Sequence, residues 1–360
     1  MKFTLKTNEI IPFDKDNKVV KRSPSNIALV KYWGKKDGQI PANPSLSFTL
    51  SKSYTETEII YTPKTDNGKI SLDFFFEDKE NELFKQKIEK FLQKIVSYFP
   101  FLSNLHLKIN SENSFPHSAG IASSASSMSA LALCLCEIER KHYGSLQHKE
   151  DFLRKASFIA RLGSGSAARS VYPYAATWGE FVENPASSDE YASPLLFDLH
   201  PVFKSYRDAI LIVSNKAKKV SSTAGHGLMH GHPFAKARFE QARKQLKTLL
   251  QALKSGDQNT FVAIVENEAL SLHALMMSSN PGFILMEPGT LQIIEKIRDY
   301  REQTGIKLCF TLDAGPNVHL LYSANDSDNV EKFIKNDLVR YCHEGLWIAD
   351  EVGEGKLSVQ

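Results

Sequence analysis

Two lysines stand four residues apart at the end of a short apolar run near the start of the chain. Residues 23–35 read SPSNIALVKYWGK, with Tyr, Trp and Gly between Lys31 and Lys35. Two cationic groups beside aromatic side chains suit a charged ligand that is partly shielded from water. A strand edge with solvated lysines has the same composition, so this segment alone leaves both interpretations open.

A loop rich in Pro, Gly and Ser precedes a long Ala/Leu/Met run. Residues 116–125 read PHSAGIASSA. Small residues let the backbone close around an anion, and the start of the following helix presents unpaired N–H groups and the positive end of its dipole. The pattern indicates a phosphate site that is not of the Walker A type. A tight helix start would look the same.

Two further segments each place one charged side chain among small residues. Residues 163–170 read GSGSAARS, and the planar guanidinium of Arg169 can hold a carboxylate or phosphate with paired hydrogen bonds. Residues 311–317 read TLDAGPN, and Asp313 follows a β-rich run at a tight turn, where rigid neighbours hold catalytic side chains. A flexible linker and an ordinary Asp-initiated turn are the respective alternatives.

Together and in this order, the four segments resemble the GHMP kinase superfamily and, within it, the diphosphomevalonate decarboxylase family. The resemblance covers about residues 23–322. The phosphate loop alone indicates only a GHMP-type ATP site, whereas K-Y-W-G-K and G-S-G-S-A-x-R-S narrow the match to the decarboxylases. The resemblance implies an α+β, two-lobed GHMP kinase-like fold with the active-site cleft between the lobes. Its expected domains are an ATP-binding one at 1–205 and an α+β one at 206–360.

The activity that the resemblance implies is an ATP-dependent decarboxylation. Enzymes of this family bind ATP and magnesium, phosphorylate the tertiary C3 hydroxyl of mevalonate 5-diphosphate, and then lose phosphate and CO2 to give isopentenyl diphosphate. By resemblance, Asp313 orients or deprotonates that hydroxyl. Lys31 stabilises charge on the transferring phosphoryl oxygens and keeps the aspartate ionised. Arg169 holds the C1 carboxylate.

The resemblance also implies two sets of binding residues. The substrate set is Asn26 and Arg169 near the carboxylate, Tyr32, Lys35, Ser164 and Ser166 at the 5-diphosphate, and Ser222 near the substrate phosphates. The nucleotide set is Ser118, Gly120, Ser123 and Ser124, with Ser124 also the expected magnesium ligand. Ser222 lies in the sequence SSTAG, and such Ser/Thr clusters also cap helices.

Two places depart from the family pattern. Residues 43–45 read NPS where the family usually has Asn-Ser-Ser, so one hydroxyl is missing near the substrate. His226 stands where the family often has Met, and His230 and His232 follow. The first two of these histidines would share a helix face, as in a metal site. Neighbouring glycines weaken such a helix and no carboxylate or cysteine is adjacent, so we expect a structural or phosphate-facing loop.

The candidate residues need regular elements to position them. Alternating β-rich and helical patterns predict strands at 55–62, 70–76, 105–109, 174–182, 209–214, 307–312 and 318–322, and helices at 81–98, 151–161, 234–253, 260–277, 290–303 and 329–340. Strands and helices are mixed without a steady βαβ repeat, which favours an α+β fold. The connection between lobes is expected at or shortly after 183–194.

Length and composition set the outer bounds. A chain of 360 residues favours two packed lobes, and its 42% hydrophobic content excludes wholesale disorder. A net charge of +3 is too mild to indicate nucleic-acid binding. Four cysteines without C-x-x-C pairing argue against a disulfide scaffold or zinc ribbon. With no apolar run long enough to span a membrane, we expect a cytoplasmic protein without membrane or nucleic-acid partners. The family resemblance implies a homodimer.

Three other functions remain open at this stage. A mevalonate monophosphate decarboxylase and a mevalonate 3-kinase belong to the same superfamily, and a nucleotide- or sugar-binding sensor would have no activity. Sister kinases often lack the Asp, Lys and Arg set, so its presence favours the full reaction. The decisive spatial expectation is that Asp313, Lys31 and Arg169 meet in one cleft.

Overall fold

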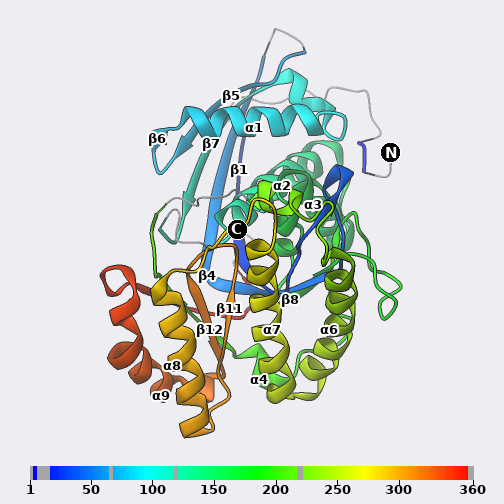
Figure 1. Ribbon diagram of the computed structural model, residues 1–360. Coiled ribbons are helices and arrows are strands. Elements are labelled where there is room, and N and C mark those ends of the chain that lie inside the picture. Colours follow the sequence, from blue (N-terminus) through cyan, green and yellow to red (C-terminus); the bar gives the residue numbers. More distant parts are fainter. Residues whose placement is uncertain (1–2, 6–16, 65–67, 117–120, 217–221, 356–360) are drawn as a thin grey trace.

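The computed structural model describes residues 3–5, 17–64, 68–116, 121–216 and 222–355, and Figure 1 shows their arrangement. Side chains are described within these ranges except at 222 and 223. Helices and strands are mixed along the whole chain, so the predicted α+β class is confirmed. No helix in these ranges is long and apolar enough to cross a membrane.

The first half of the chain is built on a seven-stranded sheet. Its order is β6-β5-β7-β4-β8-β9, with β1 paired to β4 off this path. The strands are β1 (Asn17–Val30), β4 (Ser45–Pro63), β5 (Ser71–Phe76), β6 (Lys79–Glu80), β7 (Leu105–Asn113), β8 (Ala175–Trp178) and β9 (Ala192–Pro194). The long β4 pairs with β1 along its length, with β8 in its first part and with β7 in its last part. It therefore runs from the upper part of Figure 1 to the centre of the molecule.

Three helices pack on this sheet. They are α1 (Glu82–Ile95), α2 (Ser123–Tyr143) and α3 (Lys149–Gly163), and a 3-10 helix, η2 (Pro100–Asn104), lies between the first two. One apolar face of α1 is buried, at Ile88, Phe91, Leu92 and Ile95, whereas Leu83 is exposed. The Asn81 side chain caps the helix by accepting the Phe84 N–H at 3.0 Å. The Ala/Leu/Met run of α2 is buried on nearly all sides. A hairpin of β2 (Lys35–Lys36) and β3 (Ile40–Pro41) encloses the short η1 (Asp37–Gln39).

The second half carries a four-stranded sheet of order β11-β12-β10-β13. The strands are β10 (Arg207–Leu211), β11 (Cys309–Leu312), β12 (Val318–Tyr322) and β13 (Trp347–Glu351). The helices are α4 (Pro201–Lys204), α5 (Ser222–Gly227), α6 (Ala235–Ser255), α7 (Gln258–Met277), α8 (Pro288–Thr304) and α9 (Ser327–Phe333), with short turns η4 (Ala324–Asp326) and η7 (His343–Gly345). The α6 and α7 helices pack side by side, and α7 also contacts β1 and β11.

Several element boundaries differ from the sequence predictions. The small-residue segment 163–170 is not an open loop, because most of it forms the 3-10 helix η3 (Gly165–Val171). The strand expected at 174–182 ends at Trp178, since Gly179 adopts a φ of 105° against Pro44. The expected last helix splits into α9, a π-helix η5 (Ile334–Leu338) and a 3-10 turn η6 (Val339–Tyr341). The strand β13, which pairs with β10, has no counterpart among the predicted strands.

A shared core joins the two halves. Phe48 of β4 stacks on Phe261 of α7 with ring centroids 5.8 Å apart, and Phe203 of α4 lies 4.9 Å from the same ring. Near the end of the described chain, the Gly353 N–H donates to Thr49 O at 3.2 Å. The division at 205/206 stays a prediction, and the residues on its two sides pack without a solvent gap in this cluster.

Candidate active site

A cavity of about 480 Å³ lies where the ends of β1 and β11 meet η3 and α5. Nine predicted site residues line it: Asn26, Lys31, Tyr32, Lys35, Ser124, Ser164, Ser166, Arg169 and Asp313. Ser123 lines a neighbouring cavity. Ser118 and Gly120 lie outside the described residues, and of Ser222 only the backbone is described, at the start of α5. The three expected catalytic residues therefore meet in one cavity.

An ion pair between the two halves forms one wall of the cavity. The Lys31 Nζ lies 3.2 Å from Asp313 Oδ1 and donates to the Ala28 carbonyl at 2.6 Å. Lys31 follows directly after β1, and Asp313 follows directly after β11. The lysine side chain is 2% exposed and the aspartate side chain 29%, so the carboxylate is the partner that faces the cavity. Burial lowers the pKa of Lys31, and the charge of Asp313 opposes that shift.

Arg169 brings a second positive charge to this cavity and is held by neutral oxygens. Its Nε donates to Ser47 Oγ at 2.9 Å, its Nη1 to Ser45 Oγ at 2.6 Å and its Nη2 to Asn26 Oδ1 at 3.4 Å. Among the described residues no carboxylate forms an ion pair with it. Burial lowers the pKa of Arg169 to about 10, against the opposing charge of Asp313. A buried cation that forms no ion pair with a described carboxylate is suited to bind an anionic ligand.

The altered segment 43–45 retains one of the hydroxyls that hold this arginine. Ser45 supplies it, while Pro44 packs against Gly179, where an added Cβ would lie 2.7 Å from the proline Cα. The Asn43 amide instead donates to the main-chain carbonyl of Lys31 at 3.0 Å. The departure from the family pattern therefore leaves the arginine contact in place.

Tyr32 and Lys35 form the wall of the cavity beyond the ion pair. The Tyr32 hydroxyl is buried and has no hydrogen-bond partner in the described parts of the chain. Burial raises the pKa of Tyr32, so the hydroxyl stays protonated and can donate. Its ring packs on Trp178 at 4.6 Å, and a Cβ on Gly165 would lie 2.8 Å from the tyrosine ring. Within the described ranges, Lys35 Nζ donates only to Gln39 Oε1, at 3.2 Å, which leaves it able to bind an anion.

His226 lines the same cavity between two aromatic rings. Its ring centroid lies 4.2 Å from that of Tyr32 and 4.7 Å from that of Trp33, and its Nδ1 accepts the Gly34 N–H at 3.0 Å. Burial lowers the pKa of His226 to about 3, so the imidazole is neutral, and the hydrogen bond at Nδ1 places its proton on Nε2. No group of three or more potential metal-binding His, Cys, Asp or Glu side chains occurs among the described residues.

A second cavity of about 410 Å³ adjoins the first at the start of α2. Its lining is largely apolar and includes Phe74, Phe76, Phe84, Ile88 and Met128. Ser124 and Lys87 line both cavities. The N-cap residue of α2, Ala122, adopts a φ of 41° and provides no side-chain cap. The N–H groups of its first turn are therefore suited to bind a phosphate between the two cavities.

Comparison with known proteins decides the family. The model of the diphosphomevalonate decarboxylase-like N-terminal domain matches residues 23–192, and the model of the mevalonate 5-diphosphate decarboxylase C-terminal domain matches residues 209–346. This chain belongs to the diphosphomevalonate decarboxylase family. A diphosphomevalonate decarboxylase of Aspergillus fumigatus is 31% identical to it, over 87% of this chain and 78% of that protein. The Saccharomyces cerevisiae diphosphomevalonate decarboxylase is 30% identical, over 87% and 79%.

Solved structures of diphosphomevalonate decarboxylases share the fold. A mevalonate diphosphate decarboxylase from Staphylococcus aureus superposes with a TM-score of 0.79 at 28% identity, over 94% of this chain and 96% of that one. A structure described as MDDEF in complex with MVAPP, AMPPCP and magnesium has a TM-score of 0.77 at 28% identity, over 94% and 98%. The expected family and its two-lobed GHMP kinase-like fold are thus confirmed.

Sequence reasoning missed several residues of this diphosphomevalonate decarboxylase site. Lys87 lies on the charged face of α1, and Gln39 lies in the turn between β2 and β3. Neither belongs to a motif that names a ligand. A lysine on a polar helix face is ordinary, so only its position at the junction of the cavities distinguishes Lys87.

Proposed function

We propose that this chain converts mevalonate 5-diphosphate and ATP to isopentenyl diphosphate, ADP, phosphate and CO2. The observation that carries the proposal is that Arg169, buried and in no ion pair with a described carboxylate, lies in one cavity with the Lys31–Asp313 pair. The substrate combines a carboxylate, a tertiary hydroxyl and a diphosphate, and the cavity offers a separate polar group for each. The family of the chain supports the same reaction.

Phosphorylation of the substrate is the first step. Asp313 accepts the proton of the C3 hydroxyl while the hydroxyl oxygen forms a bond to the γ-phosphorus of ATP. The bond from that phosphorus to ADP breaks in the same step. The Lys31 ammonium, 3.2 Å from the carboxylate, stabilises the negative charge on the transferring group. Burial of the lysine strengthens this interaction because water does not screen it.

Decarboxylation follows from the 3-phosphate. The C3–O bond breaks and phosphate leaves, the C1–C2 bond breaks and releases CO2, and its electron pair becomes the new double bond between C2 and C3. Arg169 holds the C1 carboxylate in place for this step, with Asn26 beside it. The serine hydroxyls on Nε and Nη1 fix the plane of the guanidinium.

The diphosphate end of the substrate lies at the other wall. Tyr32 donates its unpartnered hydroxyl, and Lys35 supplies charge. Ser164, Ser166 and Ser222 complete the expected binding set. The neutral His226 adds an N–H donor from Nε2.

ATP occupies the two adjoining cavities. The apolar cavity takes the adenosine, and Ser123, Ser124 and Lys87 hold phosphate oxygens. Ser118 and Gly120, which lie outside the described residues, belong to the same expected nucleotide set. Magnesium is held mainly by phosphate oxygens and water, so it needs few protein ligands. Ser124 would hold the ion, because this residue is exposed and lines both cavities. When bound, the ion neutralises charge on the phosphates.

Turnover of the purified chain tests the function. We expect ADP and CO2 in equal amounts from ATP, magnesium and mevalonate 5-diphosphate. ADP without CO2 would instead identify a 3-kinase, and faster turnover of the monophosphate would identify a monophosphate decarboxylase. Nucleotide binding without any turnover would identify a sensor.

The proposal extends to the assembly and location of the enzyme. We infer a cytoplasmic homodimer that binds neither nucleic acid nor membranes, on the grounds of the family resemblance, the net charge of +3 and the composition. Light scattering at several protein concentrations tests the dimer, and a mass of one chain at all of them would contradict it.

A further inference from the structure

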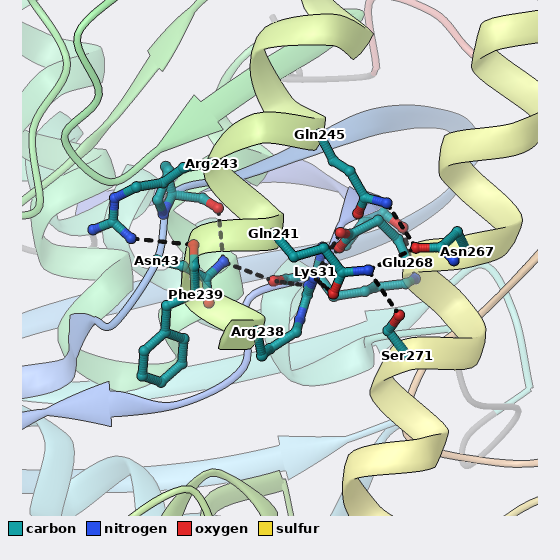
Figure 2. A network of polar contacts seen from close by, with 12 residues as sticks. Lys31, Asn43, Arg238, Phe239, Gln241, Arg243, Gln245, Asn267, Glu268 and Ser271 are labelled. Atoms are coloured by element: carbon teal, nitrogen blue, oxygen red, sulfur yellow. Dashed lines mark hydrogen bonds and ion pairs between the residues drawn. The ribbon is translucent and has the colours of Figure 1, made fainter. Parts of the chain in front are cut away.

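A buried ion pair between Arg238 and Glu268, in the second half of the chain, forms hydrogen bonds with the main chain of Lys31 (Figure 2). Glu268 of α7 accepts the Lys31 N–H at 2.8 Å. Arg238 of α6 forms hydrogen bonds with both oxygens of that carboxylate and donates to the Lys31 carbonyl at 3.4 Å. The side chains of the pair are 2% and 0% exposed. Both main-chain polar groups of Lys31 are therefore held from α6 and α7, the carbonyl together with the Asn43 amide.

The same α7 helix also holds the partner of Lys31. The His273 Nε2 lies 3.0 Å from the main-chain carbonyl of Asp313 and donates to it. Burial lowers the pKa of His273 to about 4, so the ring is a neutral donor at neutral pH. Between the two anchoring residues, Leu272 of α7 lines the cavity itself.

We propose that α7 is the positioning element of the reaction, with Glu268, backed by Arg238, setting the main chain of Lys31 and His273 setting that of Asp313. The inference rests on the proposed function. Lys31 and Asp313 follow strands of different sheets, so neither sheet alone fixes the distance between their charged atoms. One rigid helix that contacts both main chains fixes that distance. None of these three positioning residues lines the cavity.

A second, less deeply buried ion pair of α7 distinguishes this role from plain stabilisation. Glu266, two residues before Glu268, accepts from both terminal nitrogens of Arg301, which also donates to the Leu308 carbonyl at 2.8 Å. Arg298 lies 3.6 Å from the same carboxylate. Neither Glu266 nor Arg301 lines the cavity. The two pairs share their chemistry and their helix, and only one touches a residue of the site.

Arg238→Lys and Arg301→Lys form a matched comparison. Lysine keeps the charge but cannot hold two carboxylate oxygens and a carbonyl in one plane. For each variant we measure KM and the unfolding midpoint. We also measure kcat, divided by the number of chains that bind a nonhydrolysable ATP analogue. Since small misplacements of reacting groups are costly, we expect Arg238→Lys to lower kcat by about 10- to 100-fold with KM within about threefold. Arg301→Lys should keep kcat at the parent value per folded chain.

Two substitutions at His273 test the Asp313 anchor independently of the buried pair. Gln places an amide N–H close to the position of Nε2, and Leu removes the donor. We expect His273→Leu to lose about tenfold in kcat and His273→Gln to recover most of it, with the same KM for both substrates. A purely structural role predicts that kcat per folded chain is unchanged in both variants.

The outcomes separate the inference from the proposed function. Turnover of mevalonate 5-diphosphate by the parent chain tests the proposed function. The ratio of variant to parent kcat tests the positioning role of α7, and it can be measured with whichever mevalonate phosphate the parent chain consumes. Equal kcat losses in Arg238→Lys and Arg301→Lys, or no loss in Arg238→Lys and His273→Leu, would overturn the inference. If Arg238→Lys does not fold, the His273 pair decides alone.

Discussion

Two arginines near the site are buried to nearly the same degree, and their partners differ. Arg169 is 1% exposed and Arg238 is 3% exposed. Arg238 faces both oxygens of Glu268, whereas Arg169 faces the neutral oxygens of Ser45, Ser47 and Asn26. The charge of Arg238 is balanced by an ion pair, whereas Arg169 forms no ion pair with a described carboxylate.

The difference shows how a buried charge can be assigned to structure or to binding. Burial of an ion is costly, and a carboxylate with good geometry offsets that cost in the folded protein. Where no such partner exists, the compensation is left for a ligand. Arg238 accordingly belongs to the scaffold around Lys31, and Arg169 belongs to the proposed carboxylate site.

Removing the charge of Arg169 should have the largest effect, on catalysis rather than on stability. We expect Arg169→Met to lower kcat/KM for mevalonate 5-diphosphate by about 10³-fold, because a desolvated charge pair with the substrate is lost. Loss of the hydrogen bonds to the serines is offset by relief of an uncompensated charge, so the free energy of unfolding should change by less than about 1 kcal/mol. Enzyme kinetics and urea unfolding without ligands measure the two effects. A large loss of stability with normal kinetics would reverse the assignment.

The matching change at Arg238 should act on stability. Arg238→Met leaves the Glu268 carboxylate buried without its counter-charge, so we expect a loss of about 3–5 kcal/mol in the free energy of unfolding. Urea unfolding at neutral pH measures it. Restoring a balanced site in the double variant Arg238→Met with Glu268→Gln should recover part of the loss. A stability equal to that of Arg169→Met would remove the contrast between the two arginines.

A third kind of buried group, the neutral imidazole of His273, should make the free energy of unfolding depend on pH. The pKa of His273 is lowered from 6.5 to about 4, so below pH 6.5 the unfolded chain binds a proton that the folded chain does not. This contribution to stability is complete above about pH 6.5 and is lost as pH falls toward 4. We expect His273→Gln to reduce the stability loss between pH 7 and pH 5 by about 2 kcal/mol. Identical pH profiles for parent and variant would show that the imidazole is not buried neutral.

Sequence patterns predicted the residues that line the cavity better than those that hold them in place. The family, the fold class and the general order of elements are confirmed, because the four segments combine charged residues with small ones in a distinctive order. Glu268 and His273 carry no such signal, since they lie on a helix whose pattern is that of any packed helix. Lys31 and Glu268 are 237 residues apart, and no local pattern shows that they meet. The roles of the site residues stay predictions.

Some local structure also depended on contacts that the sequence does not display. The 3-10 helix at Gly165–Val171 follows from close packing, because Gly165 lies directly against Tyr32 and Trp178. The β13 strand is short and partly exposed, and it forms by pairing with β10. Both elements form because of tertiary contacts rather than because of the secondary-structure propensity of their residues.

The most direct test of the central claim is the turnover of Asp313→Asn under saturating ATP, magnesium and mevalonate 5-diphosphate. Asparagine fills the same space and cannot take the proton of the C3 hydroxyl, so we predict that ADP and CO2 release both fall by about 10³-fold while binding of the substrate and of a nonhydrolysable ATP analogue is retained. Parent-like release of ADP and CO2 by this variant would contradict the account, because the group placed at the reacting hydroxyl would then be dispensable.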